Sequence, residues 1–135
     1  MSDAGLITIP SPHPVGDTID RLTNAATAAG LRIFARVDHR LGAEEVGLEL
    51  RPTELLIFGN ARGGTPLMQD RQTVGIDLPL KALAWEDEDG RVWLTYNDPG
   101  WVAQRHGLSA KADASVAALA NGLGSLTAAA TAAQA

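Results

Sequence analysis

The sequence lacks several features that would define its class at once. It has no cysteine among its 135 residues, which excludes disulfides, iron–sulfur clusters, thiolate zinc sites and cysteine nucleophiles. It has no run of the roughly 18–20 apolar residues that a membrane-spanning helix needs. Its first five residues lack the basic and apolar segments of a secretory signal. We therefore expect a cytoplasmic protein that does not contact a membrane.

Positive charge is also scarce. The chain has 11 basic and 16 acidic residues and a net charge of −5. A broad phosphate-binding surface needs an excess of lysine and arginine, so the composition argues against nucleic acid as a partner. Apolar residues make up 45% of the chain, and this length is enough for one domain with its own core.

The spacing of apolar residues predicts the secondary structure. Strands are expected over residues 6–10, 31–38, 54–58, 78–86 and 91–96, with a further extended stretch over 46–50. Helices are expected over 19–29, with Ser11 or Asp17 as its cap, over 67–72 and 99–106, and through 116–126. This order predicts an α+β fold, strand-helix-four-strand-helix, with a mainly antiparallel sheet and the helices packed on one face.

Two of the predicted strands carry more detail. Residues 31–38 alternate, so Leu31, Ile33, Ala35 and Val37 are expected to share one face. Residues 54–58 form a continuous apolar run, which predicts a central strand covered on both faces. A sheet with helices on one side only leaves its other face bare, and a partner subunit could supply the cover.

The domain is expected to end where large apolar residues stop. Residues 1–126 form the predicted single domain. Beyond Thr127 the chain is rich in alanine and has no large apolar side chain to anchor it. We therefore expect residues 127–135 to form a frayed or disordered tail.

Five ordered segments resemble a known family. They are Val37–His39, Pro52–Asn60, Gly64–Met68, Asp77–Lys81 and Tyr96–Pro99. Together they are similar to the family called domain of unknown function 302, and the resemblance spans roughly residues 5–125. It implies a domain of the TATA-binding-protein-like class, a homodimer and no established activity.

The best candidate for a site is the glycine-rich segment 59–66. A buried strand ends there, glycines free the backbone, and Thr65–Pro66 resembles a helix start. Backbone N–H groups at a helix start attract anions and Arg62 adds positive charge, so the segment could hold a small anionic ligand. A tight structural turn is the alternative interpretation. The predicted ligand-binding residues are His39, Gly59, Asn60, Arg62, Gly64, Thr65, Lys81 and Tyr96.

Two other functions remain open at this point. The chain could be an enzyme of unassigned class, with His39 as acid–base and Lys81 or Tyr96 assisting. It could equally be a structural or interaction domain without a ligand. The three histidines have no zinc-binding spacing, so neither a metal nor a cofactor is expected. His106, beside Gly107, is expected to act as a favourable cation at a helix C-terminus.

Overall fold

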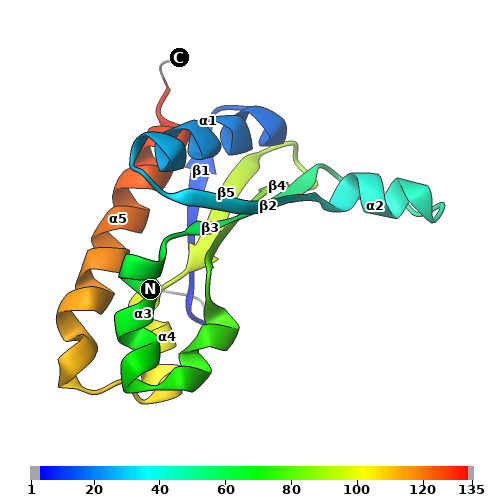
Figure 1. Ribbon diagram of the computed structural model, residues 1–135. Coiled ribbons are helices and arrows are strands. Elements are labelled where there is room, and N and C mark those ends of the chain that lie inside the picture. The colour runs from blue at the N-terminus through cyan, green and yellow to red at the C-terminus, as the bar shows by residue number, and fades with distance from the viewer. Residues whose placement is uncertain (1–3, 134–135) are drawn as a thin grey trace.

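A computed structural model describes residues 4–133 of the chain. It contains one five-stranded sheet in the order β1-β5-β4-β3-β2, in which all neighbouring strands are antiparallel (Figure 1). The strands are β1 (Leu6–Ser11), β2 (Arg32–Asp38), β3 (Thr53–Gly59), β4 (Leu80–Glu86) and β5 (Val92–Asn97). The helices are α1 (Val15–Ala28), α2 (His39–Glu45), α3 (Ala61–Asp70), α4 (Pro99–His106) and α5 (Asp113–Thr131), with 3₁₀ turns η1 (Gln72–Asp77) and η2 (Ala110–Ala112). The predicted α+β class is confirmed.

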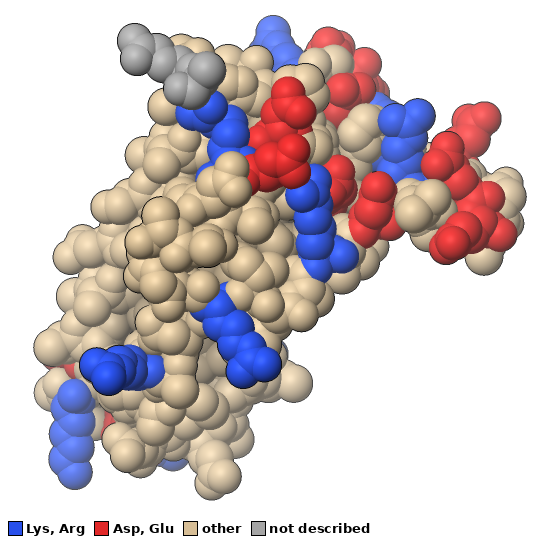
Figure 2. Space-filling view, turned by 45° about the horizontal axis from the view of Figure 1, so that its top comes forward, with Lys and Arg blue, Asp and Glu red and all other residues tan. Residues whose placement is uncertain are grey.

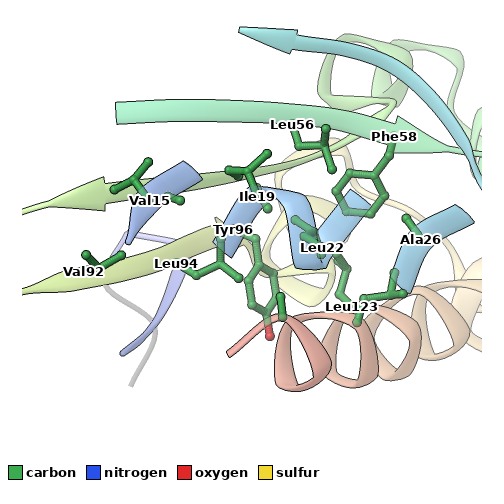
Figure 3. Packing of buried hydrophobic residues seen from close by; sticks show 14 residues of the cluster. Val15, Ile19, Leu22, Ala26, Leu56, Phe58, Val92, Leu94, Tyr96 and Leu123 are labelled. Carbon is green, nitrogen blue, oxygen red and sulfur yellow. The ribbon is translucent and has the colours of Figure 1, made fainter. Parts of the chain in front are cut away.

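The main core lies between one face of the sheet and the helices α1 and α5. Ile19 and Leu22 of α1 are fully buried, as are Leu56 and Phe58 of β3. Leu123 of α5 belongs to the same cluster and lies near Leu22 of α1 (Figure 3). Because α1 presents its apolar residues at helical spacing, one stripe of its surface covers the middle of the sheet.

A β-bulge changes the predicted facing of β2. The pairing with β3 shifts between Ile33 and Ala35. Ile33 packs against the main core, whereas Ala35 and Val37 pair with Ile57 and Leu55, which alternate with the buried residues of β3. The expectation that 31, 33, 35 and 37 share one face is therefore wrong, because the extra residue of a bulge reverses the alternation.

The second face of the sheet, called here the open face, is not part of the main core. β3 was expected to be covered on both faces, but its alternate residues Leu55 and Ile57 are only half-buried. Large apolar side chains of the open face include Val37, Leu55, Ile57, Leu83, Trp85 and Trp93. All of them are half-buried, and the rings of Trp85 and Trp93 lie 6.4 Å apart between centroids.

Some helices and strands end where the local sequence predicts, and others do not. An Asp-Gly turn joins β4 to β5, and α4 begins directly after Asp98, whose carboxylate accepts from the Gly100 N–H at 2.9 Å. Neither predicted cap of α1 is used, because α1 begins directly after Pro14 and the Ser11 hydroxyl bonds to that of Thr18 at 2.7 Å. Residues 46–50 form no strand.

The C-terminal helix extends beyond its predicted end. A frayed tail was expected over residues 127–135, but α5 continues to Thr131 with Thr127 and Ala130 buried; residues 134–135 lie outside the described residues. Arg21 of α1 donates to the carbonyl oxygens of Ala129, Ala130 and Ala132 at 3.1–3.3 Å. A cation on the last carbonyl groups stabilises a helix C-terminus.

The segment that leads through η2 into α5 is anchored to α3. The Asp70 carboxylate, at the end of α3, accepts from the Ser109 N–H at 2.6 Å and from the Ser109 hydroxyl at 2.9 Å. These bonds, the backbone one first, hold the pKa of Asp70 below its usual value. Arg21 and Asp70 therefore fix the two ends of α5, which runs between them along the side of the domain (Figure 1).

We predict that Arg21→Ala loosens the last turn of α5. Removing the guanidinium leaves three carbonyl groups without their donor, a loss of about 1 kcal/mol. Backbone amide exchange of residues 127–131 should become faster, with exchange in the sheet unchanged. Arg21→Lys keeps the charge but not the branched donor. Its exchange rates over residues 127–131 should therefore lie between those of wild type and those of Arg21→Ala. Equal exchange in wild type and variant would contradict this capping role.

We predict an acid-dependent contribution from Asp70. Its pKa is lowered in the folded state, so its contribution to stability is present above the unfolded value of about 3.9 and is lost as the pH falls through the folded value. The difference in thermal stability between wild type and Asp70→Asn should therefore shrink as the pH falls from neutral to below about 4. A difference that is the same at all pH values would show that the carboxylate charge is not involved.

Candidate ligand-binding site

Helix α3 begins immediately after the strand that delivers it. Gly59 ends β3 with a φ of 151°, a conformation that favours glycine. The next residue, Asn60, caps the helix, because its side-chain oxygen accepts from the Gly63 N–H at 2.7 Å. The glycine-rich segment 59–66 is therefore mostly helix. The expected cap Thr65 lies inside it, since Asn60 supplies an earlier and complete cap.

A cavity of about 600 Å³ lies beside the first turns of α3. Its walls come from the start of α3, the segment that joins η1 to β4, the region around the start of β2, and the middle of α5. This volume is in the usual range for small-molecule sites. The large apolar side chains of its lining are Leu31, Phe34, Met68, Leu78, Leu80, Leu119, Leu123 and Leu126.

Glycines set the width of the cavity. A Cβ added to Gly63 would lie 3.2 Å from Leu119 Cδ2, and one added to Gly64 would lie 3.3 Å from Leu78 Cδ1. α3 therefore packs close to both neighbouring walls. Gly122 of α5 also lines the cavity, but a Cβ added there would meet nothing within 4 Å. The open space lies in front of Gly122.

The few polar groups of the lining include those at the start of α3. The N–H groups of Ala61 and Arg62 have no acceptor within the helix, since the first turn of any helix lacks one. The helix dipole adds a partial positive charge there, and the Arg62 side chain is exposed at the same place. Thr65 and Ser115 add hydroxyl groups. The site can therefore accept a mainly apolar molecule that carries one anionic group.

Five of the eight predicted ligand-binding residues come together here. Gly59, Asn60, Arg62, Gly64 and Thr65 all line the cavity. Because these residues are close in sequence, their grouping could be predicted. They lie at the end of β3 and directly after it. The end of β3 thus opens on the cavity.

The other three predicted residues lie elsewhere. His39 begins α2 and is exposed. Lys81 pairs with Ile57 on the open face, and Tyr96 is buried in the main core beside Ala82. None of these three residues lines the cavity. The proposed acid–base set of His39 with Lys81 or Tyr96 is also not assembled.

The sequence reasoning missed the wall formed by α5. Leu119, Leu123 and Leu126 have helical spacing, which predicts a helix with a narrow apolar stripe and no more. Ser115 and Gly122 lie on the same wall, and no local signal distinguishes a helix that lines a cavity from one that fills a core. Phe34 was missed because the bulge in β2 has no mark in the sequence.

Ionisable groups cluster near the end of α4 but do not reach the cavity. His106 Nε2 lies 2.5 Å from Asp77 Oδ2, and Arg105 Nη1 contacts both oxygens of the same carboxylate at 3.1 Å. His106 thus bonds a carboxylate at the end of η1, in addition to its place in the last turn of α4. Within residues 4–133, no three histidine, aspartate or glutamate side chains are arranged to hold a metal ion.

Comparisons with known proteins agree with this fold. The crystal structure of an uncharacterised conserved protein DUF302 from Bacillus stearothermophilus superimposes with a TM-score of 0.82, covering 93% of this chain and 97% of that one. Sequence identity is 17%, so the likeness concerns the fold alone.

Curated relatives are much closer in sequence. The chain is 54% identical over 125 residues to proteins named fluoride-specific ion channel FluC 1 from Brucella suis and Brucella abortus. The match covers 93% of this chain but only 49% and 46% of those proteins, so the chain spans about half the length of the curated relatives it matches. Among the described residues, no helix has the length and apolar character needed to cross a membrane.

The family comparison covers most of the chain and agrees with the resemblance seen in five of its segments. Residues 7–126 match the family described as Domain of unknown function DUF302. The matched range includes β2 to β5, all of β1 except Leu6, α1, and the whole wall of the cavity that α3 contributes. The chain therefore belongs to the DUF302 family.

Proposed function

We propose that the domain binds a small amphipathic molecule, with an apolar body and one anionic group, in the cavity between α3 and α5. The cavity itself is the observation that carries the proposal. A hollow of about 600 Å³ in a domain of 135 residues leaves apolar side chains without packing partners, which costs stability unless a ligand fills it.

The anionic end of the ligand would lie at the start of α3. The free N–H groups of the first turn, the helix dipole and the Arg62 guanidinium all favour negative charge there. The apolar body would contact Leu119 and Leu123 on the opposite wall. Binding rather than catalysis is favoured, because no acid–base pair lies among the residues that line the cavity.

The test uses a matched pair of glycines in α5. Gly122 lines the cavity and Gly124 does not, and neither has a neighbour within 4 Å of an added Cβ. Gly122→Leu should therefore fill the cavity, while Gly124→Leu places the same side chain outside it. Both should favour the helix by about 0.8 kcal/mol, so a difference between them reports on the cavity.

The probe is 1-anilinonaphthalene-8-sulfonate, an aromatic sulfonate whose fluorescence rises in apolar sites. We predict that wild type and Gly124→Leu bind it alike, and that Gly122→Leu weakens binding at least about 10-fold. Arg62→Gln should weaken the sulfonate more than the uncharged parent amine. Equal binding to the two leucine variants would place the probe elsewhere and remove the support for a ligand site in this cavity.

A second candidate function follows from the relatives. A segment 54% identical to this chain forms part of proteins named as fluoride-specific ion channels. The domain could therefore act with such a channel and respond to fluoride, with the first turn of α3 as the anion site. Fluoride would need only the N–H groups of that turn and not the apolar cavity.

This second candidate predicts a local response to fluoride. In a titration with sodium fluoride followed by NMR, the amide signals of Ala61, Arg62 and Gly63 should move in a saturable way, and sodium chloride should not reproduce the change. Shifts that are spread over the whole domain, or that are equal with both salts, would show that the domain does not recognise fluoride.

A further inference from the structure

A nearly buried histidine side chain bridges a carboxylate and an exposed hydroxyl, away from the cavity. The side chain of His106, at the end of α4, is 8% exposed. Its Nε2 lies 2.5 Å from Asp77 Oδ2, and its Nδ1 lies 3.3 Å from Thr73 Oγ1. Asp77 and Thr73 both belong to η1. None of the three residues lines the cavity between α3 and α5, so they form a separate cluster.

The carboxylate decides which nitrogen of the ring carries the proton. A carboxylate can only accept a hydrogen bond, so in the neutral imidazole Nε2 is the donor and Nδ1 keeps its lone pair. The Thr73 hydroxyl therefore donates to Nδ1 of His106. A hydroxyl that donates to an imidazole held by a carboxylate is the arrangement that activates an alcohol as a nucleophile. A separation slightly longer than about 3.2 Å is common before a substrate binds.

Packing holds the hydroxyl and the imidazole in this arrangement. Val74, the residue after Thr73, is fully buried and belongs to the same small apolar cluster as Val102 of α4. A Cβ added to Gly75 would lie 3.1 Å from Met68 Sδ, so η1 also packs closely on α3. The two elements that carry the cluster are thus fixed to each other and to the domain.

The contact with Thr73 is not needed to anchor α4 on η1. The Asp77 carboxylate already bonds α4 through Arg105 Nη1, at 3.1 Å from both oxygens, and through His106 Nε2. These bonds join the two elements without the second ring nitrogen. That nitrogen faces the hydroxyl of Thr73, a residue exposed to solvent. The cluster therefore presents a nucleophile to molecules in solution.

The chemistry of the cluster limits the substrates that it can attack. Within residues 4–133, Arg105 is the one lysine or arginine bonded to the cluster, and its partner is Asp77. An oxyanion formed beside Thr73 would therefore lack the donors that lower the barrier in efficient acyl-transfer enzymes. Only acyl groups on a weakly basic leaving group are then reactive enough. Ile76 is 74% exposed and follows Thr73 by three residues in the 3₁₀ turn, so it offers apolar contact to a small acyl group.

The charge distribution admits a donor with an anionic leaving group. On the face shown in Figure 2, acidic side chains gather towards the end of the molecule that bears α1 and α2. α4 lies at the opposite end (Figure 1). The Asp77 carboxylate beside His106 is paired with Arg105, which offsets its charge.

We propose that Thr73 is an acylation site that takes an acyl group from a small activated donor, an acyl phosphate or an activated ester, with His106 as its base. Thr73 Oγ1 attacks the acyl carbon, and its proton passes to His106 Nδ1. The bond from the acyl carbon to the leaving oxygen then breaks, the leaving group takes the proton from Nδ1, and Thr73 keeps the acyl group as an ester. Asp77 is a positioning residue that holds the ring. The reaction does not involve the cavity, so this proposal and the ligand proposal stand or fall separately.

The first test treats the whole protein with p-nitrophenyl acetate and locates the acetyl group by mass spectrometry. Trypsin should release residues 72–81 as one peptide, in which Thr73 is the only hydroxyl side chain. This peptide should gain one acetyl group, with p-nitrophenolate released in equal amount. Acetylation of Lys81 is told apart because it blocks cleavage after that residue. An unmodified 72–81 peptide would overturn the proposal.

The neighbouring peptide provides a control within the same molecule. Residues 63–71 contain Thr65 as their only hydroxyl side chain. Thr65 is exposed, as Thr73 is, but among the described residues the hydroxyl bonded to an imidazole is that of Thr73. Thr73 should therefore be acetylated at least about 100-fold faster than Thr65, which is within the usual contribution of a general base. Equal rates at the two threonines would show that Thr73 is not activated.

Substitutions test the roles of the hydroxyl and the imidazole. Thr73→Val should remove the acetylation of residues 72–81 and the p-nitrophenolate release that accompanies it, whereas Thr73→Ser keeps a hydroxyl and should retain both. His106→Gln should slow the reaction of Thr73 at least about 100-fold. His13→Gln is the matched control, because the His13 ring bonds the Ala132 carbonyl oxygen at 2.6 Å rather than a hydroxyl, and it should leave the rate unchanged. Equal rates in the two glutamine variants would exclude His106 as the base.

Acetyl phosphate in place of the ester distinguishes the two kinds of donor. Acetylation of residues 72–81 by both compounds supports the site for neutral and anionic donors alike. Acetylation by the ester alone supports the site and excludes acyl phosphates as its donors. If neither compound modifies Thr73 in the folded wild-type protein, the hydroxyl is not an acyl acceptor.

Discussion

The packing of α1 and α5 against one face of the sheet is the constraint on which the rest of the structure depends. The fully buried side chains Leu22 and Phe58, with Leu123 beside them, join helix to sheet and helix to helix. Since burying a leucine or phenylalanine contributes about 1.5–3 kcal/mol, this contact fixes where α5 lies. The same contact leaves the other face of the sheet without cover.

The cavity lies where α5 passes from one apolar cluster to another. Leu123 and Leu126 pack in the main core, whereas Leu119 belongs to a second, smaller cluster that also contains Leu67 and Val74. Between these clusters α5 has small residues such as Gly122, which fill little space.

Much of the fold and part of the site could be predicted from local patterns. The hairpin after β4 and the ends of α4 depend on Asp-Gly, Asp-Pro and His-Gly pairs, whose effects act within a few residues. Asn60, Arg62 and Thr65 were found for the same reason. Lys81 and Tyr96 do not join the cavity because their positions depend on which face of the sheet meets a helix, and residues distant in sequence decide this. His39 does not join it because the chain leaves the sheet there and begins α2.

The sequence by itself determined the fold class, the approximate positions of the five strands along the chain, and the glycine-rich segment that follows β3, because spacing and turn residues act locally. Only the tertiary structure decided the bulge in β2, which face of the sheet stays uncovered, and how α2 projects from the sheet. It also decided the ordered end of α5 and the wall that α5 contributes to the cavity. Each of these arises from contacts between residues far apart in the chain, such as Arg21 with Ala130. Such contacts carry no periodic or compositional mark.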